Sequence, residues 1–181
     1  MALNPRRSFL VRATGLAVSA SLLSASRGAL ASLPETRSLA FEHTHTGERL
    51  TTVYAIGDRY RPEGLRQINR ILRDHYSGEV GSMDPRLFDQ LHELKRLLGC
   101  DAPFQVISGY RCPATNAALR KRGGGVARRS LHLEGRAIDI RLPGVALAEL
   151  RDAALDLKLG GVGYYPASNF VHVDSGRVRH W

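Results

Sequence analysis

Two short segments in the second half of the chain constrain the fold most, because apolar and polar residues alternate along both. Residues 137–141 are Ala-Ile-Asp-Ile-Arg, and residues 170–174 are Phe-Val-His-Val-Asp. Successive side chains of a β-strand point to opposite faces, so we expect the isoleucines and valines to enter a core. Asp139, His172 and Asp174 then project from the opposite face. If the two strands are neighbours, Asp139 and His172 come together.

The rest of the chain predicts a small domain of helices and strands. Apolar residues at helical spacing predict helices, and runs of β-branched and aromatic residues predict strands. The expected helices cover residues 62–72, 84–98, 112–121 and 145–157, and the expected strands cover residues 50–56, 104–107, 137–142, 161–165 and 170–174. Because helices come first and paired strands last, we predict a single α+β domain with an antiparallel sheet flanked by helices.

Residues 1–31 have the features of an export signal. Arg6 and Arg7 precede an apolar stretch without acidic residues, and residues 29–31 are Ala-Leu-Ala, which suits cleavage by signal peptidase. Paired arginines resemble a twin-arginine signal. An uncleaved anchor is the alternative, but the apolar run, residues 16–23, is far shorter than the ~20 residues that span a bilayer.

We therefore predict a periplasmic protein with no stable membrane anchor after cleavage. Residues 32–46 are polar and rich in hydroxyl groups, which predicts a lead-in segment. Residues 47–181 then form the domain, which we expect to be a monomer.

The chain is basic, with a formal net charge of +9. The arginines of residues 1–31 carry part of that charge, and another part lies between Arg120 and Arg141. A basic surface suits an acidic polymer such as a cell wall with free carboxylates, although an ordinary solvated basic loop is the alternative. We expect no nucleic-acid partner, because the chain has no nucleic-acid-binding motif and exported proteins rarely meet nucleic acid.

The two cysteines, Cys100 and Cys112, leave two possibilities open. In an oxidising compartment they could form a disulfide, which would close a short loop and add about 2–3 kcal/mol of stability. They could equally remain free. Neither lies in a Cys-x-x-Cys pattern, so we expect no metal site built on cysteine.

A further candidate, His132, precedes the first of the two alternating strands. Residues 123–125 are three glycines, which allow the preceding loop to fold over the sheet. His132, Asp139 and His172 can then converge on one zinc ion. Two imidazoles and one carboxylate leave one tetrahedral position for water, whose pKa zinc lowers towards neutrality. A closed structural site would need a fourth protein ligand, and none stands out nearby.

The residues around these ligands resemble one group of zinc peptidases. The pattern Ser130-x-His132-x-x-Gly135-x-Ala137-x-Asp139 follows Ser-Gly-Tyr-Arg at residues 108–111 and precedes a late His172. It is similar to the group that contains D-alanyl-D-alanine carboxypeptidases and dipeptidases, L-alanyl-D-glutamate endopeptidases and the hedgehog signalling domain. Residues 73–75, 107–111 and 170–174 are most similar to the murein endopeptidase K branch.

The resemblance implies a fold of the hedgehog and D-Ala-D-Ala peptidase type with one catalytic zinc ion over residues 47–181. It implies that His132, Asp139 and His172 are the zinc ligands. It also implies that Arg111 contacts substrate and steadies negative charge that develops on the scissile carbonyl. The implied activity is hydrolysis of cross-links in peptidoglycan. A zinc-fold module that binds peptidoglycan without cleaving it, and a D,D- or L,D-carboxypeptidase, are the alternatives.

Further residues are expected to contact the substrate. Ser130 belongs to the same motif as His132, and Tyr164 and its neighbour Tyr165 lie just before the last strand, where they could line a groove. A structural alternative for Tyr164 is simple cover for the sheet edge.

The general base is left open. Many related peptidases have Glu, Asp or His three residues before the last metal histidine, and this chain has Asn169 there. Asp174 is one candidate base, since it shares a strand face with His172. Its alternative role is to accept the free N–H of a metal-bound histidine. We expect no second metal site from the other histidines, which are His43, His45, His75, His92 and His180.

Overall fold

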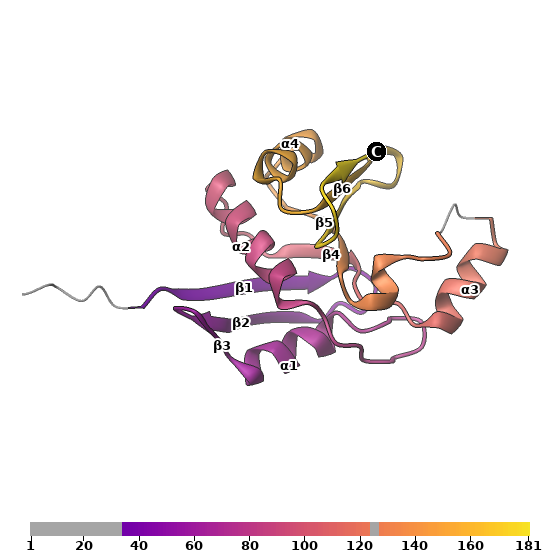
Figure 1. Cartoon of the computed structure of the whole chain (residues 1–181), viewed down its shortest axis with the longest axis horizontal. Helices are drawn as coiled ribbons and strands as arrows, with labels where there is room; N and C mark the ends of the chain where they lie inside the picture. Colours follow the sequence, from indigo (N-terminus) through magenta and orange to yellow (C-terminus); the bar gives the residue numbers. More distant parts are fainter. Residues whose placement is uncertain (1–33, 124–126) are drawn as a thin grey trace, which may run out of the picture. The chain divides into compact units, whose positions relative to one another are not determined.

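The computed structural model describes residues 34–123 and 127–181. The predicted signal over residues 1–31 lies outside the described residues. Within them, eight strands form one sheet in the order β3-β2-β1-β4-β5-β7-β6-β8, accompanied by four α-helices (Figure 1). This architecture confirms the predicted α+β class.

The strands are β1 (Thr36–His43), β2 (Arg49–Ile56), β3 (Arg59–Tyr60), β4 (Phe104–Ser108), β5 (Ala137–Arg141), β6 (Gly161–Tyr165), β7 (Phe170–Asp174) and β8 (Arg179–His180). The helices are α1 (Pro62–Ile71), α2 (Pro85–Leu98), α3 (Pro113–Lys121) and α4 (Leu147–Leu157). Two 3₁₀ turns, η1 (Leu131–Glu134) and η2 (Pro166–Ser168), precede β5 and β7.

The sheet is predominantly antiparallel, as expected, but β1 pairs with β4 and β6 pairs with β8 in parallel. Parallel neighbours need a long crossover connection, and the chain between β1 and β4 supplies one that contains α1 and α2. The two strands with alternating sequences are neighbours, since β7 lies between β5 and β6. The adjacency predicted from the sequence is therefore confirmed.

Strand β1 corrects the expectation that residues 32–46 are only a lead-in. It lies between β2 and β4, where Phe41 pairs with Leu50 on one side and Phe104 on the other. Leu39 and Phe41 are each 1% exposed. Only one face of β1 is fully buried, and Leu39 and Phe41 are the only large apolar residues on that face, so the alternation is too short to stand out in the sequence. The two-residue strands β3 and β8 are too short to show any periodicity.

The helices form where their sequence signals predict. Helix α2 follows Asp84, whose carboxylate accepts a hydrogen bond from the Arg86 backbone N–H at 3.0 Å. It ends at Gly99, which adopts the left-handed conformation with a φ of 58°. Helix α1 packs against β2, α2 against β1, and α4 against β6 and β7. Figure 1 shows α3 at one end of the domain, apart from these three helices.

Strands β5 and β7 have the two faces that their alternation predicts. Ile138, Ile140 and Val171 are fully buried in the single hydrophobic core. Asp139 and His172 point to the other face and are direct partners in the β5–β7 register. Because strand pairing fixes their separation, the sheet itself brings these two side chains together.

Both cysteines are free. Cys112 caps α3, where its sulfur accepts a hydrogen bond from the Thr115 backbone N–H at 3.4 Å. The Cys100 sulfur lies 3.7 Å from the Pro143 carbonyl oxygen. The two thiols therefore lie in separate local environments and do not form a disulfide with each other.

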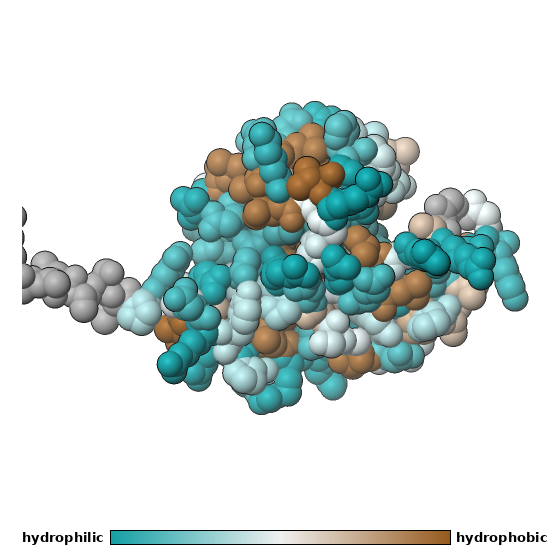
Figure 2. Space-filling model, in the orientation of Figure 1, coloured by the Kyte–Doolittle hydropathy of each residue, from teal (hydrophilic) through white to brown (hydrophobic). Residues whose placement is uncertain are grey.

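The face of the molecule in Figure 2 is mostly hydrophilic, with apolar residues in separate patches. None of the helices in the part of the chain that the structure describes is long and apolar enough to cross a membrane.

Candidate metal centre

His132, Asp139 and His172 converge on one point, and each is at most 9% exposed. Asp139 Oδ1 lies 2.8 Å from His172 Nδ1 and 3.3 Å from His132 Nε2. The two imidazole nitrogens are 3.3 Å apart. The pairing of β5 with β7 places Asp139 and His172, and turn η1 brings His132 to them.

This triangle fits a tetrahedral metal ion. Ligand atoms that are each about 2.0–2.1 Å from zinc at tetrahedral angles lie about 3.3 Å from one another, which is close to the observed edges. Among residues 34–123 and 127–181, no other group of three His, Cys, Asp or Glu side chains brings its ligand atoms this close together. Two imidazoles with one carboxylate also form the donor set of open catalytic zinc sites. The three residues could therefore hold one metal ion.

The remaining nitrogen of each histidine already has a hydrogen-bond acceptor. His132 Nδ1 lies 2.7 Å from the Gly109 carbonyl oxygen, and His172 Nε2 lies 3.1 Å from Asp174 Oδ2. An N–H on each of these nitrogens leaves the lone pair of His132 Nε2 and of His172 Nδ1 directed at the common point. Such partners orient metal-binding histidines and raise their basicity.

Charge at the site favours a bound cation. Burial by itself lowers the pKa of His172, but Asp139 and Asp174 outweigh burial and raise that pKa to about 8. Burial raises the pKa of Asp139, yet His132 and His172 hold it well below its usual range. In the protein without metal, a proton on His172 therefore occupies the position that a metal ion would take.

Asp174 is fully buried, and both of its carboxylate oxygens have hydrogen-bond partners. Its Oδ1 accepts hydrogen bonds from the backbone N–H groups of Gly161 (3.1 Å) and Gly176 (2.8 Å) and from Arg179 (3.0 Å). Its Oδ2 accepts from Arg179 at 2.7 Å and faces His172. Burial raises the pKa of Asp174, but His172 and Arg179 hold it well below its usual range. This geometry favours the role of partner to His172 over that of a base.

The loop that carries His132 is held by the motif residues on either side. Ser130 Oγ accepts a hydrogen bond from the His132 backbone N–H at 3.4 Å. Gly135 ends turn η1 with a φ of 65°, and a Cβ there would lie 2.0 Å from the Ser82 carbonyl oxygen. The Asp84 backbone N–H donates to the Gly135 carbonyl at 2.8 Å. Glycine is therefore required at position 135 both for its conformation and for its lack of a side chain.

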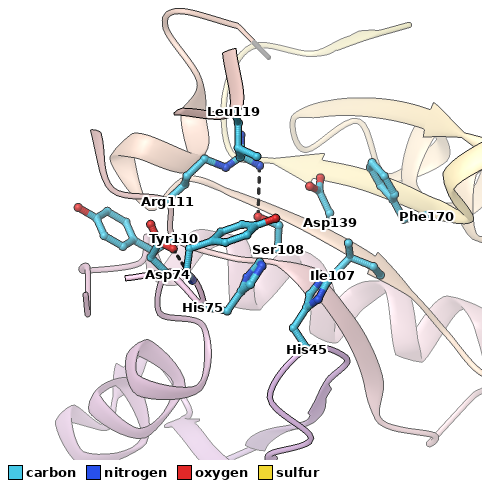
Figure 3. Close-up of a pocket in the computed structure, with 11 residues that line it drawn as sticks. His45, Asp74, His75, Ile107, Ser108, Tyr110, Arg111, Leu119, Asp139 and Phe170 are labelled. Carbon is cyan, nitrogen blue, oxygen red and sulfur yellow. Dashed lines mark hydrogen bonds between the residues drawn. The ribbon is translucent and has the colours of Figure 1, made fainter. Parts of the chain in front are cut away.

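Arg111 lies beside the metal cluster on the loop that follows β4. Its backbone N–H donates to the His132 carbonyl at 3.1 Å, and its guanidinium donates to Ser108 Oγ at 3.3 Å (Figure 3). Gly109 allows this loop to pack against α1, because a Cβ at that position would lie 2.5 Å from the Leu72 carbonyl oxygen. No carboxylate in the described part of the chain forms an ion pair with Arg111, so its charge is available to a ligand.

Two hollows meet at the cluster, and both are lined by Arg111, Asp139 and Phe170. The first, of about 200 Å³, is shown in Figure 3 and is also lined by His45 and His75; we name it the His75 hollow. The second, of about 420 Å³, also contains His132, His172 and Trp181; we name it the Trp181 groove. The two hollows therefore share part of their lining at the cluster.

Comparison with known proteins decides the family. The family described as peptidoglycan L,D-endopeptidase MepK matches residues 31–181. The chain belongs to this family. Peptidoglycan L,D-endopeptidase MepK of Escherichia coli strain K12 is 45% identical over 175 residues, which cover 97% of this chain and 96% of that protein.

Two further matches are more distant. A Haemophilus influenzae protein named probable peptidoglycan L,D-endopeptidase MepK is 42% identical over 168 residues, with 92% of this chain and 90% of that protein covered. The crystal structure of the Serratia marcescens L-Ala D-Glu endopeptidase ChiX is 24% identical, has a TM-score of 0.34 and covers 42% of this chain and 62% of that chain.

Asn169, where many related peptidases have an acid or a histidine, has a local structural explanation. It follows turn η2 in the left-handed conformation, with a φ of 55°. Asparagine adopts this conformation more readily than most residues other than glycine. The geometry of the turn thus accounts for asparagine at this position in this member of the MepK family.

The structure does not bring Tyr164 to the metal cluster. In the β6–β7 register Tyr164 pairs with Val171, a core residue, and the Arg151 guanidinium of α4 lies 4.6 Å from the centre of its ring. Its neighbour Tyr165 has the opposite orientation and lines the Trp181 groove. Successive residues of a strand point to opposite faces, so only one of these two neighbouring tyrosines can face the groove.

Two residues near the cluster were missed. Arg179 forms the ion pair with Asp174, and Trp181 lines the groove beside His172. Both lie on or directly after the two-residue strand β8, whose sequence carries no periodic signal. A basic residue two positions before an aromatic one is too common a pattern to identify a site.

Proposed function

We propose that this protein is a zinc-dependent endopeptidase that hydrolyses cross-links in bacterial cell-wall peptidoglycan. The observation that carries the proposal is the triangle of His132 Nε2, Asp139 Oδ1 and His172 Nδ1, whose edges match tetrahedral zinc. The relatives are named peptidoglycan L,D-endopeptidases, which supplies the substrate class.

The three ligands would hold zinc, which when bound supplies a Lewis acid for the scissile carbonyl and a water of lowered pKa. The chain's own contribution is to fix the ligands. The Gly109 carbonyl holds the N–H of His132, and Asp174 holds the N–H of His172. Arg179 in turn holds Asp174 through two hydrogen bonds.

Arg111 would bind the substrate near the scissile bond and stabilise negative charge on its carbonyl oxygen. Support comes from its position at the junction of the two hollows, and from the fact that no carboxylate among residues 34–123 and 127–181 forms an ion pair with it. Ser108, its hydrogen-bond partner, would limit the orientations of the guanidinium. Ser130 lines the Trp181 groove and would contact the substrate from the His132 loop.

We assign no carboxylate as a separate base. Among the residues that line the two hollows, the only acids are the ligand Asp139 and Asp74. Asp74 accepts hydrogen bonds from the backbone N–H groups of Tyr76 and Cys112 at 2.9 Å each, so its oxygens face the protein. Asp174 is proposed to position His172.

Cleavage within a chain, in preference to removal of a terminal residue, is supported by the shape of the site. A carboxypeptidase needs a closed pocket for a terminal carboxylate, whereas an endopeptidase must hold peptide on both sides of the bond. Two hollows that share Arg111 and Asp139 provide that space.

Digestion of purified peptidoglycan tests the proposal. With zinc present, we expect the protein to release new muropeptides whose masses identify cleaved cross-links, and a chelator should stop the release. His172→Ala should remove both zinc binding and hydrolysis from a folded protein. His92→Ala is the matched control, because His92 lines a separate hollow. The His92→Ala protein should cleave peptidoglycan normally. A wild-type protein that binds peptidoglycan but releases no product with any divalent metal would instead support the binding module.

We further propose that residues 1–31 direct export by the twin-arginine pathway and are then removed, which leaves a periplasmic monomer. The paired arginines and the Ala-Leu-Ala sequence at residues 29–31 support this. The N-terminal sequence of the protein purified from the periplasm tests it. A first residue near position 32 is expected, and failure of Arg6→Lys with Arg7→Lys to block export would contradict the pathway.

A further inference from the structure

The Trp181 groove has an aromatic wall to which the proposed chemistry gives no role. The rings of Tyr165 and Phe170 stack with centroids 4.6 Å apart. The Trp181 indole N–H donates to the Tyr165 hydroxyl at 2.6 Å. Trp181 nevertheless remains 49% exposed, so a large apolar surface is open to a ligand in the groove.

This wall is held rigidly. The Trp181 backbone N–H donates to the Val162 carbonyl at 3.2 Å, and the Trp181 backbone oxygen accepts from the Tyr164 N–H at 3.0 Å. The Arg179 guanidinium lies 4.8 Å from the centre of the Trp181 ring. Gly163 leaves the space that the indole occupies, because a Cβ there would lie 2.8 Å from it. A rigid aromatic surface binds a ligand with little loss of side-chain freedom.

The wall lies directly beside the metal cluster, since the Trp181 and His172 rings have centroids 5.3 Å apart. His172 is already oriented by Asp174 and by its strand pairing with Asp139, so the indole is not needed for that purpose. Because the indole lies so close to the metal cluster, a ligand group that touches it would lie next to the scissile bond.

The other lining residues define the charge of that ligand group. Arg111 and Arg129 both line the groove, and neither forms an ion pair within the described residues. Arg179, by contrast, is neutralised by Asp174. An apolar wall together with an unpaired guanidinium suits a side chain that has an aliphatic stretch and a free carboxylate.

We propose that Trp181, Tyr165 and Phe170 form a specificity subsite that packs against the aliphatic part of the peptide residue beside the scissile bond, while Arg129 binds a carboxylate of that residue. This inference rests on the proposed peptidase function and names the substrate feature that the groove selects.

Steady-state kinetics of the zinc-loaded full chain tests the subsite. The substrates are a soluble cross-linked muropeptide dimer with free carboxylates and the same dimer with those carboxylates amidated. Trp181→Ala should raise KM about tenfold, with kcat and zinc content nearly unchanged, and Trp181→Phe should recover most of the loss. Leu97→Ala, at an exposed position on α2, is the apolar control and should behave as wild type.

Arg129→Ala should raise KM for the free dimer and leave KM for the amidated dimer unchanged. Its neighbour Arg128 does not line the groove, so Arg128→Ala is the matched control. An unchanged KM in Trp181→Ala, a KM change that follows zinc loss, or equal effects of Arg129→Ala on both dimers would overturn the proposal.

A binding measurement separates this proposal from the proposed function. Trp181 is the only tryptophan of the chain, so its fluorescence reports on the groove directly. On mixing with the free dimer, a saturable change in fluorescence is expected even if no bond is cleaved. Cleavage without any such change would overturn the subsite and leave the peptidase, whereas a change without cleavage would do the opposite.

Discussion

At the scale of single residues, the site depends on side chains that would not touch a metal. Asp174 accepts the His172 N–H, and Arg179 holds Asp174 with two hydrogen bonds. The N–H of His132 is held in a similar way by a backbone group, the Gly109 carbonyl. A metal centre on a sheet face needs such partners, because an imidazole that can rotate presents its lone pair in the wrong direction.

Asp174→Asn should separate positioning from proton transfer. An asparagine has one acceptor oxygen where Asp174 uses two, so it cannot accept from His172 and from the Gly161 and Gly176 N–H groups at the same time. It also loses the charge and the ion pair with Arg179. We expect zinc affinity to fall about 10- to 100-fold, with turnover at saturating zinc close to wild type. Equilibrium zinc titration and kinetics measure the two quantities. Asp152→Asn, at an exposed ion pair on α4, is the control. If Asp174→Asn keeps normal zinc affinity but its turnover falls more than about tenfold, Asp174 acts as a general base instead.

Zinc affinity should depend on pH through His172. In the protein without metal its pKa is raised from 6.5 to about 8, so a proton must leave before zinc binds at neutral pH. Apparent affinity is therefore expected to fall as pH decreases from about 8 to 6, by up to about tenfold per pH unit from this group.

Stability without metal should change in the opposite direction. Because the folded pKa of His172 exceeds its unfolded value, the protonated form contributes stability that is fully present below pH 6.5 and is lost as pH rises through about 8. Zinc titrations and thermal melts of chelated protein between pH 6 and 9 check both trends. A zinc affinity that does not vary over this interval would contradict the predicted protonation.

At the scale of elements, short turns with glycine set the positions of the site residues. Turn η1 carries His132, and Gly135 ends it in the left-handed conformation against the Ser82 carbonyl. The loop that carries Arg111 approaches α1 only because residue 109 is glycine. These close approaches connect the loops to the rest of the fold, so the loops are not free to vary.

Gly135→Ala should damage both stability and the metal site. The new Cβ would meet backbone 2.0 Å away and occupy a left-handed conformation. We expect a loss of about 2 kcal/mol or more in unfolding free energy, with weaker zinc binding as η1 shifts. Gly144→Ala is the matched control, because Gly144 also has a positive φ, 85°, but nothing lies within 4 Å of its Cβ position. Denaturant unfolding should show about 1 kcal/mol for that variant, and equal losses would contradict the steric argument.

At the scale of the whole molecule, one sheet joins segments from both ends of the domain. Strand β1 lies between β2 and β4, and β4 continues the sheet to β5 and the metal face. The residues just after the predicted export signal therefore belong to the fold itself. Removal of this strand would leave an edge of β4 unpaired and expose part of the core.

Phe41→Ala tests the contribution of β1. Phe41 is 1% exposed and its ring lies 6.4 Å from that of Phe104, centroid to centroid. We expect a loss of about 3–5 kcal/mol in unfolding free energy, as for other buried phenylalanines. Val80→Ala, at a position that is 52% exposed, should change stability by less than about 0.5 kcal/mol. Urea denaturation measures the free energy of unfolding of both variants. A small loss in Phe41→Ala would contradict a structural contribution of β1 to the stability of the domain.

The sequence by itself determined the features that depend on local geometry. Alternation along residues 137–141 and 170–174 predicted which side chains face the core, because the twofold repeat of a strand is a property of its own backbone. Apolar residues at helical spacing predicted the helices for the same reason. Spacing and motif together identified the group of His132, Asp139 and His172 that the structure brings together.

Only the tertiary structure decided which distant groups surround those three residues. The contact of Gly109 with His132, the pairing of β8 with β6 that brings Arg179 and Trp181 to the cluster, and the place of β1 inside the sheet all follow from how separate elements pack. The pairing of β6 with β7 decides that Tyr165, and not its neighbour Tyr164, faces the groove. Such contacts depend on how whole elements pack, and no local pattern of residues encodes that packing.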